Sequence, residues 1–393
     1  MTLIAQPRTD VNNPIHIGII GLSCKPDAWA TLAHLPYLRV SPYYKIVALC
    51  NSSVPAAKAS IKAHALPPST RAYDSPVRLA QDADVDLVVV CTRVDTHFAM
   101  AQPALAAGKD VFIEWPLAAT TAQARELLAL AQAKQVRTLI GLQGRASPTI
   151  LKIKAIVDSG RLGPIHSINV RAVSGVWQGN ISSKRYEHFL NKEVGGNLLT
   201  IYGGHILDSV FAALGELQPG SYSTLLGNLR PQMQIVDDAS NPVNSATETR
   251  LKSTPDQILL QGRLARSPAA VFSLHIRAGK RFAGTPGLTW RIYGDVAELV
   301  VEFESASLQI GQCSSMRICD LMSMTGVEPK VEEVDVEQGG RQWTDLPVQA
   351  QNIGRVYEAF AEEGRGEGWG MAVRRHELID EFYGRDGDPK EPT

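Results

Sequence analysis

Short apolar runs alternate with longer amphipathic stretches between residues 15 and 141. Five short runs, rich in β-branched residues, are apolar at consecutive positions and predict strands buried on both faces: 15–20, 45–49, 87–91, 110–113 and 138–140. Four stretches between them repeat apolar residues at three- and four-residue spacing and predict helices: 28–38, 54–65, 96–107 and 121–134. Strands and helices in this alternation predict a parallel sheet with crossover helices.

The pattern changes after Pro148. One more helix is predicted over 149–159, and alternating apolar and polar positions then predict antiparallel strands at 165–173, 258–264, 271–276 and 288–293. We expect residues 215–255, which are rich in Gly, Asn, Pro and Ser, to form long surface connections. Helical periodicity returns over 352–363 and 376–383, and the polar tail 385–393 is expected to be disordered.

Composition narrows the classes of function. The chain has 39 Lys and Arg against 40 Asp and Glu, so no basic surface is available to bind nucleic acid directly. Residues 1–14 lack a basic region followed by an apolar core, and runs such as 87–91 have the length of strands, which argues against membrane binding. The five cysteines form no Cys-x-x-Cys pair, so we expect neither disulfides nor a metal site, and a cytoplasmic location.

The first predicted strand ends in Gly18-Ile19-Ile20-Gly21-Leu22-Ser23 and leads into a helix. This is where a dinucleotide-binding fold places the pyrophosphate, because the backbone and the helix N-terminus both favour phosphate there. Gly21 stands at the first position of the glycine fingerprint and Ser23 at the second, while residues 24–27 displace the third glycine. A purely structural turn is the alternative.

The second strand is followed by Asn51, Ser52 and Ser53. A carboxylate at this place would bind the adenosine ribose and repel a 2′-phosphate, whereas these three side chains can donate hydrogen bonds to one. The sequence therefore favours NADP over NAD as the cofactor.

These segments predict an α/β protein with a Rossmann dinucleotide-binding domain over 14–147. An α+β domain for substrate binding and oligomerisation, on a mostly antiparallel open sheet, is expected over 148–345. Helices over 346–384 are expected to pack back, and residues 385–393 to form a disordered tail. One face of the open sheet must be covered, which predicts a homo-oligomer, most simply a dimer.

Residues 107–116, Ala-Gly-Lys-Asp-Val-Phe-Ile-Glu-Trp-Pro, resemble the AGKxVxxEKP signature of the glucose-fructose oxidoreductase, inositol dehydrogenase and MocA superfamily. Residues 92–97 are similar to its TPxxxH loop, with Arg93 in place of the proline. A wider set of residues resembles the branch that contains the fungal galactose-regulon repressors: Trp29, Ala30, His34, Pro36, Glu114, Trp115, residues 142–145, Ser147, Pro148, Gly204, His205, Asp208, Pro255, Asp256, Gln261 and Gly262.

The resemblance implies cofactor contacts from the loops that follow the third, fourth and fifth strands. Thr92 and His97 belong to the first of these loops, although a lone histidine can also cap the next helix. Glu114 is implied near the nicotinamide ribose, and we expect a cis peptide between Trp115 and Pro116. Gln143 is expected to reach the cofactor or the substrate.

Trp115 departs from the dehydrogenase pattern. The dehydrogenases that share this signature have a lysine at this position. It lies beside the nicotinamide and helps to transfer the substrate proton. An indole cannot act as an acid or base near neutral pH. The repressor branch also has tryptophan at this position, and its members bind a dinucleotide and regulate transcription without turnover.

His205 and Asp208 lie three residues apart and would share one face of a helical turn. The resemblance implies that this pair lines the substrate pocket, where the histidine can exchange a proton with a hydroxyl or carbonyl. Hydrogen bonds that only stabilise the helix start are the alternative. Lys184 and Tyr186 are candidates to replace the missing lysine, although surface lysines are usually only solvated.

Three functions remain open. The favoured one is an NAD(P)-dependent oxidoreductase that passes a hydride between nicotinamide and a small hydroxyl or carbonyl substrate, such as a sugar, a polyol or a specialised metabolite. The second is a non-catalytic, dinucleotide-binding transcriptional regulator that acts through protein partners, which would place the chain in the nucleus. The third is an isomerase or lyase that retains its dinucleotide.

Overall fold

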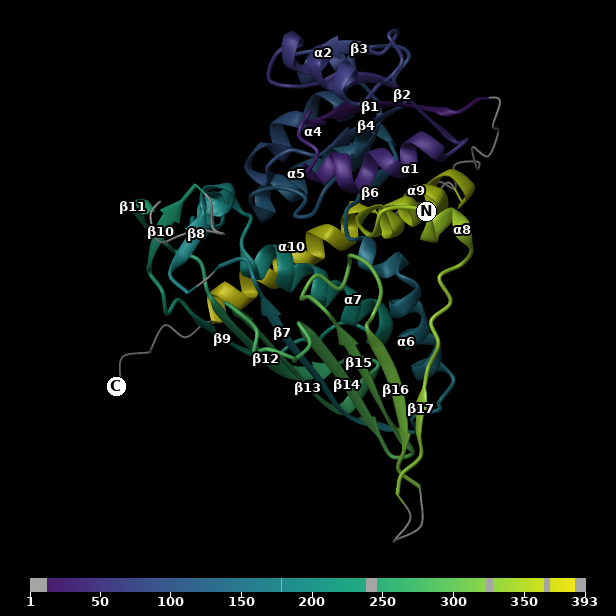
Figure 1. The fold of residues 1–393 in the computed structure, drawn as a ribbon, viewed down its shortest axis with the longest axis vertical. Helices are drawn as coiled ribbons and strands as arrows, with labels where there is room; N and C mark the ends of the chain where they lie inside the picture. The colour runs from purple at the N-terminus through teal and green to yellow at the C-terminus, as the bar shows by residue number, and fades with distance from the viewer. Residues whose placement is uncertain (1–12, 178, 238–245, 323–327, 364–367, 386–393) are drawn as a thin grey trace. The chain divides into compact units, whose positions relative to one another are not determined.

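The computed structural model describes residues 13–177, 179–237, 246–322, 328–363 and 368–385. The chain divides into two compact units (Figure 1). Unit 1 comprises residues 1–146 and 338–377, and unit 2 comprises residues 147–337 and 378–393. Among the described residues, no helix is both long and apolar enough to span a bilayer.

Unit 1 contains a six-stranded, fully parallel sheet in the order β3-β2-β1-β4-β5-β6. Its strands are β1 (Ile15–Ile20), β2 (Tyr44–Cys50), β3 (Arg71–Tyr73), β4 (Leu87–Val90), β5 (Asp110–Ile113) and β6 (Thr138–Ile140). All four residues of β4 are completely buried, which explains why this strand shows no alternation in sequence. The strand order reverses between β1 and β4, the place where such sheets open a crevice for ligands.

The helical segments of unit 1 are η1 (Ala30–His34, a π-helix), α1 (Leu35–Val40), α2 (Val54–Ala63), α3 (Pro76–Ala80), η2 (Val94–Thr96), α4 (His97–Ala106), α5 (Thr121–Lys134), η3 (Gln143–Ala146), α8 (Arg341–Thr344) and α9 (Val348–Glu363). Helix α10 (Trp369–Arg385) begins in unit 1 and ends in unit 2. Ile353, Tyr357 and Phe360 of α9 belong to the same buried apolar cluster as β1. A late segment of the chain therefore completes the core of the N-terminal sheet.

Unit 2 is built on an eight-stranded sheet in the order β17-β16-β15-β14-β7-β13-β12-β9, in which all neighbours are antiparallel except β7 and β13. Its strands are β7 (Ile165–Ser174), β9 (Ser223–Gly227), β12 (Gln257–Leu264), β13 (Ser267–Ala278), β14 (Leu288–Gly294), β15 (Ala297–Phe303), β16 (Ser315–Asp320) and β17 (Val331–Glu333). A three-stranded sheet is formed by β8 (Ile181–Ser183), β10 (Gln232–Val236) and β11 (Ala246–Leu251).

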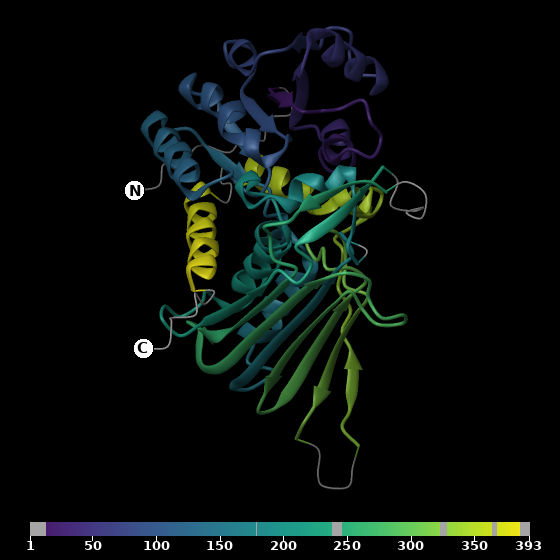
Figure 2. The same cartoon turned by 90° about the vertical axis from the view of Figure 1, so that its left-hand side faces the viewer.

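The helical segments of unit 2 are α6 (Pro148–Asp158), η4 (Lys184–Leu190), η5 (Lys192–Val194), η6 (Leu198–Gly203, a π-helix) and α7 (Gly204–Leu214). Helices α6 and α7 lie along one face of the eight-stranded sheet, while the other face is open (Figure 2). Burial alternates along β14 and β15 because successive side chains point to opposite faces: Trp290, Ile292, Leu299 and Val301 are buried on the covered face, whereas Tyr293 is exposed on the other. The expected α/β architecture, with a parallel and a mostly antiparallel sheet, is confirmed.

Several expectations for individual segments were wrong. Residues 215–255 are not only connections, because β9, β10 and β11 lie within them. The side chains of β9 are exposed or half-buried at the sheet edge, whereas β10 alternates exposed Gln232 and Gln234 with buried Met233 and Ile235, an alternation too short to stand out among polar residues. The short elements β3 and α3 were missed, and the helix expected over 28–38 begins as a π-helix at Ala30. Residues 386–393 of the expected tail lie outside the described residues.

Candidate functional site

Gly21 follows β1 in a conformation that only glycine adopts easily. Its φ is 96°, and a Cβ at this position would lie 2.6 Å from the carbonyl oxygen of Cys91. The Gly21 amide donates a hydrogen bond of 3.0 Å to the carbonyl oxygen of Cys50. The turn therefore packs directly against the ends of β2 and β4, and position 21 has no room for a side chain.

A cavity of about 380 Å³ lies at this edge of unit 1. Its lining includes Gly21, Asn51, Ser52, Thr92 and Arg93, which come from the loops after β1, β2 and β4. Four of these residues are the cofactor candidates from the sequence, so the fold brings them together around one cavity. In sheets of this topology the β1–β2 side of the crevice receives the adenosine half of a dinucleotide.

The polar residues after β2 differ in what their side chains do. The Asn51 Nδ2 donates to the Leu22 carbonyl oxygen at 3.0 Å and to Ser60 Oγ at 3.1 Å. Ser53 is the N-cap of α2, and its Oγ accepts from the Ala56 amide at 3.2 Å. Ser52 is exposed and, among the described residues, makes no side-chain hydrogen bond, so its hydroxyl is the group available to a ligand.

Two charged side chains at this cavity were not identified from the sequence as site residues. Arg93 stands where the family loop has proline, and it forms a bidentate ion pair with Asp95 at 2.7 and 2.6 Å. Asp74, which follows β3, also contributes to the lining. Ser23, by contrast, accepts a local hydrogen bond of 3.2 Å from the Lys25 amide, and the cavity lining does not include it.

His97 is buried at the start of α4 and ties two loops together. Its Nδ1 lies 2.8 Å from the Pro116 carbonyl oxygen, and its Nε2 lies 3.0 Å from the Thr92 carbonyl oxygen. Burial lowers the pKa of His97. The peptide between Trp115 and Pro116 is cis, as expected. His97 thus supports the loops after β4 and β5 through their backbone.

Glu114 follows β5 and is held by a histidine that the sequence did not identify as a site residue. His34 Nε2 lies 2.8 Å from Glu114 Oε1, and His34 Nδ1 lies 2.8 Å from the Tyr357 hydroxyl. A Cβ on Gly141 would lie 2.7 Å from Glu114 Oε2, so the carboxylate packs on the backbone after β6. His34 was noted in sequence only as part of the family resemblance, and its partner Tyr357 had no signal at all.

His34, Cys91 and Glu114 offer ligand atoms that all lie within 4.8 Å of one another, a set that can hold a metal ion. The donors already satisfy each other, since His34 Nε2 is bonded to the Glu114 carboxylate. Burial also raises the pKa of the Cys91 thiol, which keeps it in the protonated form that binds metals poorly.

Trp115 and Gln143 are both buried in unit 1. The Trp115 ring lies 5.0 Å from the ring of His376, and burial lowers the pKa of His376 to about 4. The Gln143 Oε1 is buried and has no hydrogen-bond partner within the described residues. A buried amide oxygen without a partner is costly, which makes Gln143 a group that a ligand or water can satisfy.

His205 and Asp208 lie in the first turn of α7, and both are buried in unit 2. Burial lowers the pKa of His205 to about 3, so its imidazole is neutral at physiological pH. Its Nδ1 is buried and makes no hydrogen bond with any described residue. The neutral ring can therefore accept or donate one hydrogen bond to a bound molecule.

Lys184 and Tyr186 lie on η4, in the loop before α7. The Lys184 side chain is 70% exposed, and its Nζ lies 3.9 Å from Asp237. The Tyr186 ring packs against Phe189 at 5.6 Å. No hydrogen bond or ion pair between described residues joins either side chain to His205.

A buried ion pair in unit 2 was also missed. Lys252 Nζ lies 3.1 Å from Asp256 Oδ2, with both side chains fully buried, and donates to the Thr254 carbonyl oxygen at 2.7 Å. Its ammonium group lies 5.2 Å from the Trp177 ring. Asp256 belongs to the residues of the family resemblance, and the pair stabilises the turn that leads into β12.

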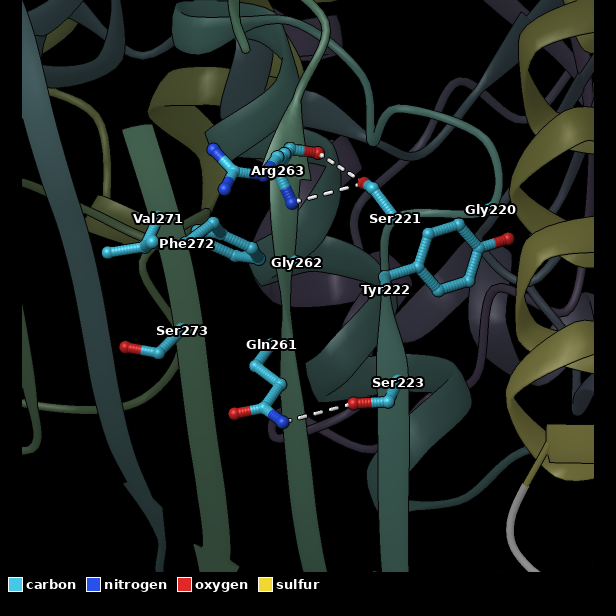
Figure 3. A pocket seen from close by; sticks show the side chains of 10 residues that line it. All are labelled: Gly220, Ser221, Tyr222, Ser223, Gln261, Gly262, Arg263, Val271, Phe272 and Ser273. Carbon is cyan, nitrogen blue, oxygen red and sulfur yellow. Dashed lines mark hydrogen bonds between the residues drawn. The ribbon is translucent and has the colours of Figure 1, made fainter. Parts of the chain in front are cut away.

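The open face of the eight-stranded sheet carries a shallow hollow of about 570 Å³ (Figure 3). Its polar groups bond one another. The Gln261 Nε2 donates to Ser223 Oγ at 3.2 Å, and the Arg263 amide donates to Ser221 Oγ at 3.2 Å. Gln261 and Gly262 are part of the resemblance set, and the hollow contains none of the candidate cofactor or catalytic residues.

Two family models match the chain. Residues 15–142 match the oxidoreductase family with an NAD-binding Rossmann fold, named GFO_IDH_MocA, and residues 148–303 match the C-terminal domain of Gal80p. The dehydrogenase aclE of Aspergillus oryzae is 34% identical over 292 residues, which cover 73% of this chain and 76% of that protein. The galactose/lactose metabolism regulatory protein GAL80 of Saccharomyces cerevisiae is 28% identical over 314 residues, 76% of this chain and 68% of that protein.

Solved structures show the same fold. A super-repressor mutant of Gal80p from Saccharomyces cerevisiae superposes with a TM-score of 0.81 at 24% identity, covering 95% of this chain and 96% of that chain. A levoglucosan dehydrogenase in complex with NADH and levoglucosan gives a TM-score of 0.73 at 15% identity, covering 95% of this chain and 97% of that chain. Both a dehydrogenase and a regulator are thus similar to this chain over most of its length.

Proposed function

Because the chain belongs to the glucose-fructose oxidoreductase, inositol dehydrogenase and MocA family of oxidoreductases, we propose that it is an NAD(P)-dependent oxidoreductase. It would pass a hydride between nicotinamide and a small hydroxyl or carbonyl substrate, of the sugar, polyol or specialised-metabolite class. The observation that carries the proposal is the cavity around Gly21, Asn51, Ser52 and Thr92 at the strand-order reversal. Its size and position suit the adenosine half of the cofactor.

Each unit contributes different groups to this function. In unit 1 the Gly21 turn leaves room for the pyrophosphate, and Ser52 and Thr92 bind the adenosine half of the dinucleotide. Glu114 and Gln143 bind its nicotinamide half. When bound, the dinucleotide supplies or accepts the hydride. In unit 2 the neutral imidazole of His205 binds the substrate oxygen, and Asp208, one helical turn away on α7, is the second proposed pocket residue. Lys184 and Tyr186 remain candidates for the exchange of this proton with solvent.

The cofactor preference proposed here is NADP. Its support is the Ser52 hydroxyl, which lines the cavity and has no partner among the described residues. Asn51 and Ser53 contribute less than the sequence suggested, because their side chains already hydrogen-bond within the loop and α2.

Turnover can be tested with the purified full-length chain. Absorbance at 340 nm should fall when NADPH is mixed with a panel of sugar and aliphatic carbonyl compounds. The variant His205→Ala should lower kcat/KM at least roughly 100-fold. A matched variant, His166→Ala, removes an exposed histidine of β7 and should retain the rate of the parent. Tight dinucleotide binding with no turnover of any compound would contradict the enzymatic function.

Trp115 favours a second candidate function. A tryptophan replaces the lysine of the dehydrogenase motif, and the buried indole cannot transfer a proton. The chain would then bind a dinucleotide and regulate transcription through a protein partner. The GAL80 relative is named a regulatory protein of galactose and lactose metabolism. Cofactor binding without turnover, together with binding of an acidic activation segment, would support this function over the first.

We also infer that two copies of the chain associate through the open face of the eight-stranded sheet. Leu225, Leu259, Val271 and Tyr293 are exposed on this face, at positions that alternate with the buried side. An exposed apolar set on an uncovered sheet is typical of a contact between subunits.

A further inference from the structure

Three buried side chains of unit 1 form a hydrogen-bonded chain that ends at Glu114. The Tyr357 hydroxyl lies 2.8 Å from His34 Nδ1, and His34 Nε2 lies 2.8 Å from Glu114 Oε1. The Tyr44 hydroxyl donates to the Tyr357 backbone oxygen at 2.6 Å, which anchors α9 beside the sheet. His34 and Tyr357 are completely buried, so no water competes for these bonds.

The direction of both hydrogen bonds in this series is set by Tyr357, the residue at its buried end. Burial raises the pKa of Tyr357 well above its ordinary value, so its hydroxyl keeps the proton and donates it to His34 Nδ1. An imidazole that accepts at Nδ1 carries its own proton on Nε2, and this N–H points at Glu114 Oε1. The two hydrogen bonds therefore hold the Glu114 side chain in one orientation, with Oε1 directed at the His34 ring.

Glu114 and the adenosine cavity both lie at the carboxyl edge of the parallel sheet. The cavity lies near β1 and β2, and Glu114 lies in the other half of the sheet, after β5. It follows β5, between the ends of β4 and β6, and its carboxylate packs on Gly141. Its side chain keeps 12% of its surface exposed, so it remains accessible to a ligand. A dinucleotide that spans the crevice from the cavity near β1 and β2 brings its nicotinamide half over β4, β5 and β6.

We propose that His34 and Tyr357 are positioning residues that hold the Glu114 carboxylate in place. The negative charge of this carboxylate then makes the site favour the oxidised dinucleotide. The oxidised nicotinamide ring is cationic and the reduced ring is neutral, so a nearby carboxylate attracts only the first. Trp115 strengthens the preference, because the lysine of the dehydrogenase motif would have supplied a neighbouring positive charge. The inference rests on the proposed binding of a nicotinamide dinucleotide.

Calorimetric titration of the full chain with NADP⁺ and, separately, with NADPH tests this inference. Glu114→Gln keeps the shape of the side chain and removes its charge, so affinity for NADP⁺ should fall roughly tenfold relative to affinity for NADPH. Tyr357→Phe removes only the hydroxyl that fixes the His34 ring and should move the same ratio roughly threefold. The matched control is Asp86→Asn, which removes a carboxylate at the opposite, amino edge of the sheet, where it accepts from the His16 amide; its ratio should equal that of the parent.

The ratio of affinities separates this role from a structural one, because a loosened fold weakens both forms together. Equal weakening of the two forms in Glu114→Gln, or an unchanged ratio, overturns the inference and leaves dinucleotide binding intact. If Glu114→Gln does not fold, the test uses Tyr357→Phe. An unchanged ratio of NADP⁺ to NADPH affinity in Tyr357→Phe then overturns the inference. A parent chain that binds neither form refutes both this inference and the proposed function.

Discussion

At the scale of single residues, we propose that the Ser52 hydroxyl decides between the two cofactors. It lines the adenosine cavity, while its neighbours Asn51 and Ser53 hydrogen-bond to the loop and to α2. Ser52→Asp would place a negative charge where the 2′-phosphate is proposed to bind. We expect the ratio of NADP to NAD affinity to fall at least roughly tenfold, measured by titration with each oxidised form.

The matched variant Ser53→Asp places the same charge one residue further on, where aspartate still serves as an N-cap of α2. It should change the ratio less than Ser52→Asp. Equal preference for NADP in the parent chain and in Ser52→Asp would refute the assignment of Ser52.

His205 and His376 are buried as neutral rings, which makes stability depend on pH. Burial lowers their pKa values to about 3 and about 4, whereas an unfolded histidine titrates near pH 6.5. Below pH 6.5 the unfolded chain therefore binds more protons than the folded chain, and the free energy of unfolding falls as the pH drops toward 4. Above pH 6.5 these histidines add no pH dependence.

His376→Gln should reduce this loss by up to about 1.4 kcal/mol per pH unit between pH 6 and 4, measured by urea denaturation at a series of pH values. His166→Gln, which replaces an exposed histidine, is the control and should leave the slope of the parent. The same slope in the parent and in His376→Gln would show that burial does not hold this ring neutral.

Residue roles were predictable from sequence only where the partner is close along the chain. In Ser53-Val54-Pro55, a serine followed closely by proline is a typical helix start, which indicates that Ser53 caps α2. This local pattern distinguishes the role of Ser53 from that of Ser52. The bond between His34 and Tyr357 joins residues 323 apart in sequence, and no local pattern reports it. The resemblance implied a pocket position for His205, whereas the absence of a partner at its Nδ1 among the described residues depends on packing.

At the scale of elements, two π-helical segments precede the helices that matter most for the site. Ala30–His34 leads into α1 and ends with the residue that holds Glu114, and Leu198–Gly203 leads into α7 with His205. Such segments are rare overall, but those that occur often lie at functional sites. Apolar spacing of three and four residues predicts a helix but does not distinguish α from π, so the sequence indicated only that helices lie there.

The turn after β1 is an element that one added methyl group should disrupt. In Gly21→Ala the Cβ would lie 2.6 Å from the Cys91 carbonyl oxygen, at a φ of 96°. We expect a loss of about 2 kcal/mol or more in the free energy of unfolding, and weaker dinucleotide binding. Gly108→Ala is the matched control, because its φ is 74° but a Cβ there meets nothing within 4 Å.

Gly108→Ala should lower stability by about 1 kcal/mol and leave dinucleotide affinity unchanged. Urea denaturation and calorimetric titration measure the two effects. If Gly21→Ala binds the dinucleotide as tightly as Gly108→Ala, the turn does not admit the pyrophosphate.

At the scale of the whole molecule, the types of the two large sheets followed from the sequence, while the three-stranded sheet and the completion of the large sheets did not. The consecutive apolar runs of β1, β4 and β5 and the alternation along β13 and β14 indicate one parallel and one antiparallel sheet. The strand order of the second sheet, which places β7 between β13 and β14, has no local signal. The addition of α9 to the core of unit 1 likewise depends on long-range packing.

The open sheet face leads to a prediction about assembly. Leu259→Glu places a charge on the exposed side of β12, and we expect this variant to be a monomer where the parent chain is a dimer, as measured by light scattering during size-exclusion chromatography. Leu251→Glu changes a more exposed leucine on β11, in the small sheet, and should remain dimeric. A parent chain that is already monomeric would refute the proposed interface.

The central claim is that unit 1 binds a nicotinamide dinucleotide at the carboxyl edge of its parallel sheet. Calorimetric titration of the full chain with NADP⁺, NADPH, NAD⁺ and NADH tests it directly. The account predicts saturable binding of one molecule per chain for at least one of the four, with a Kd below about 100 μM. A folded chain that binds none of the four at about 1 mM would contradict it.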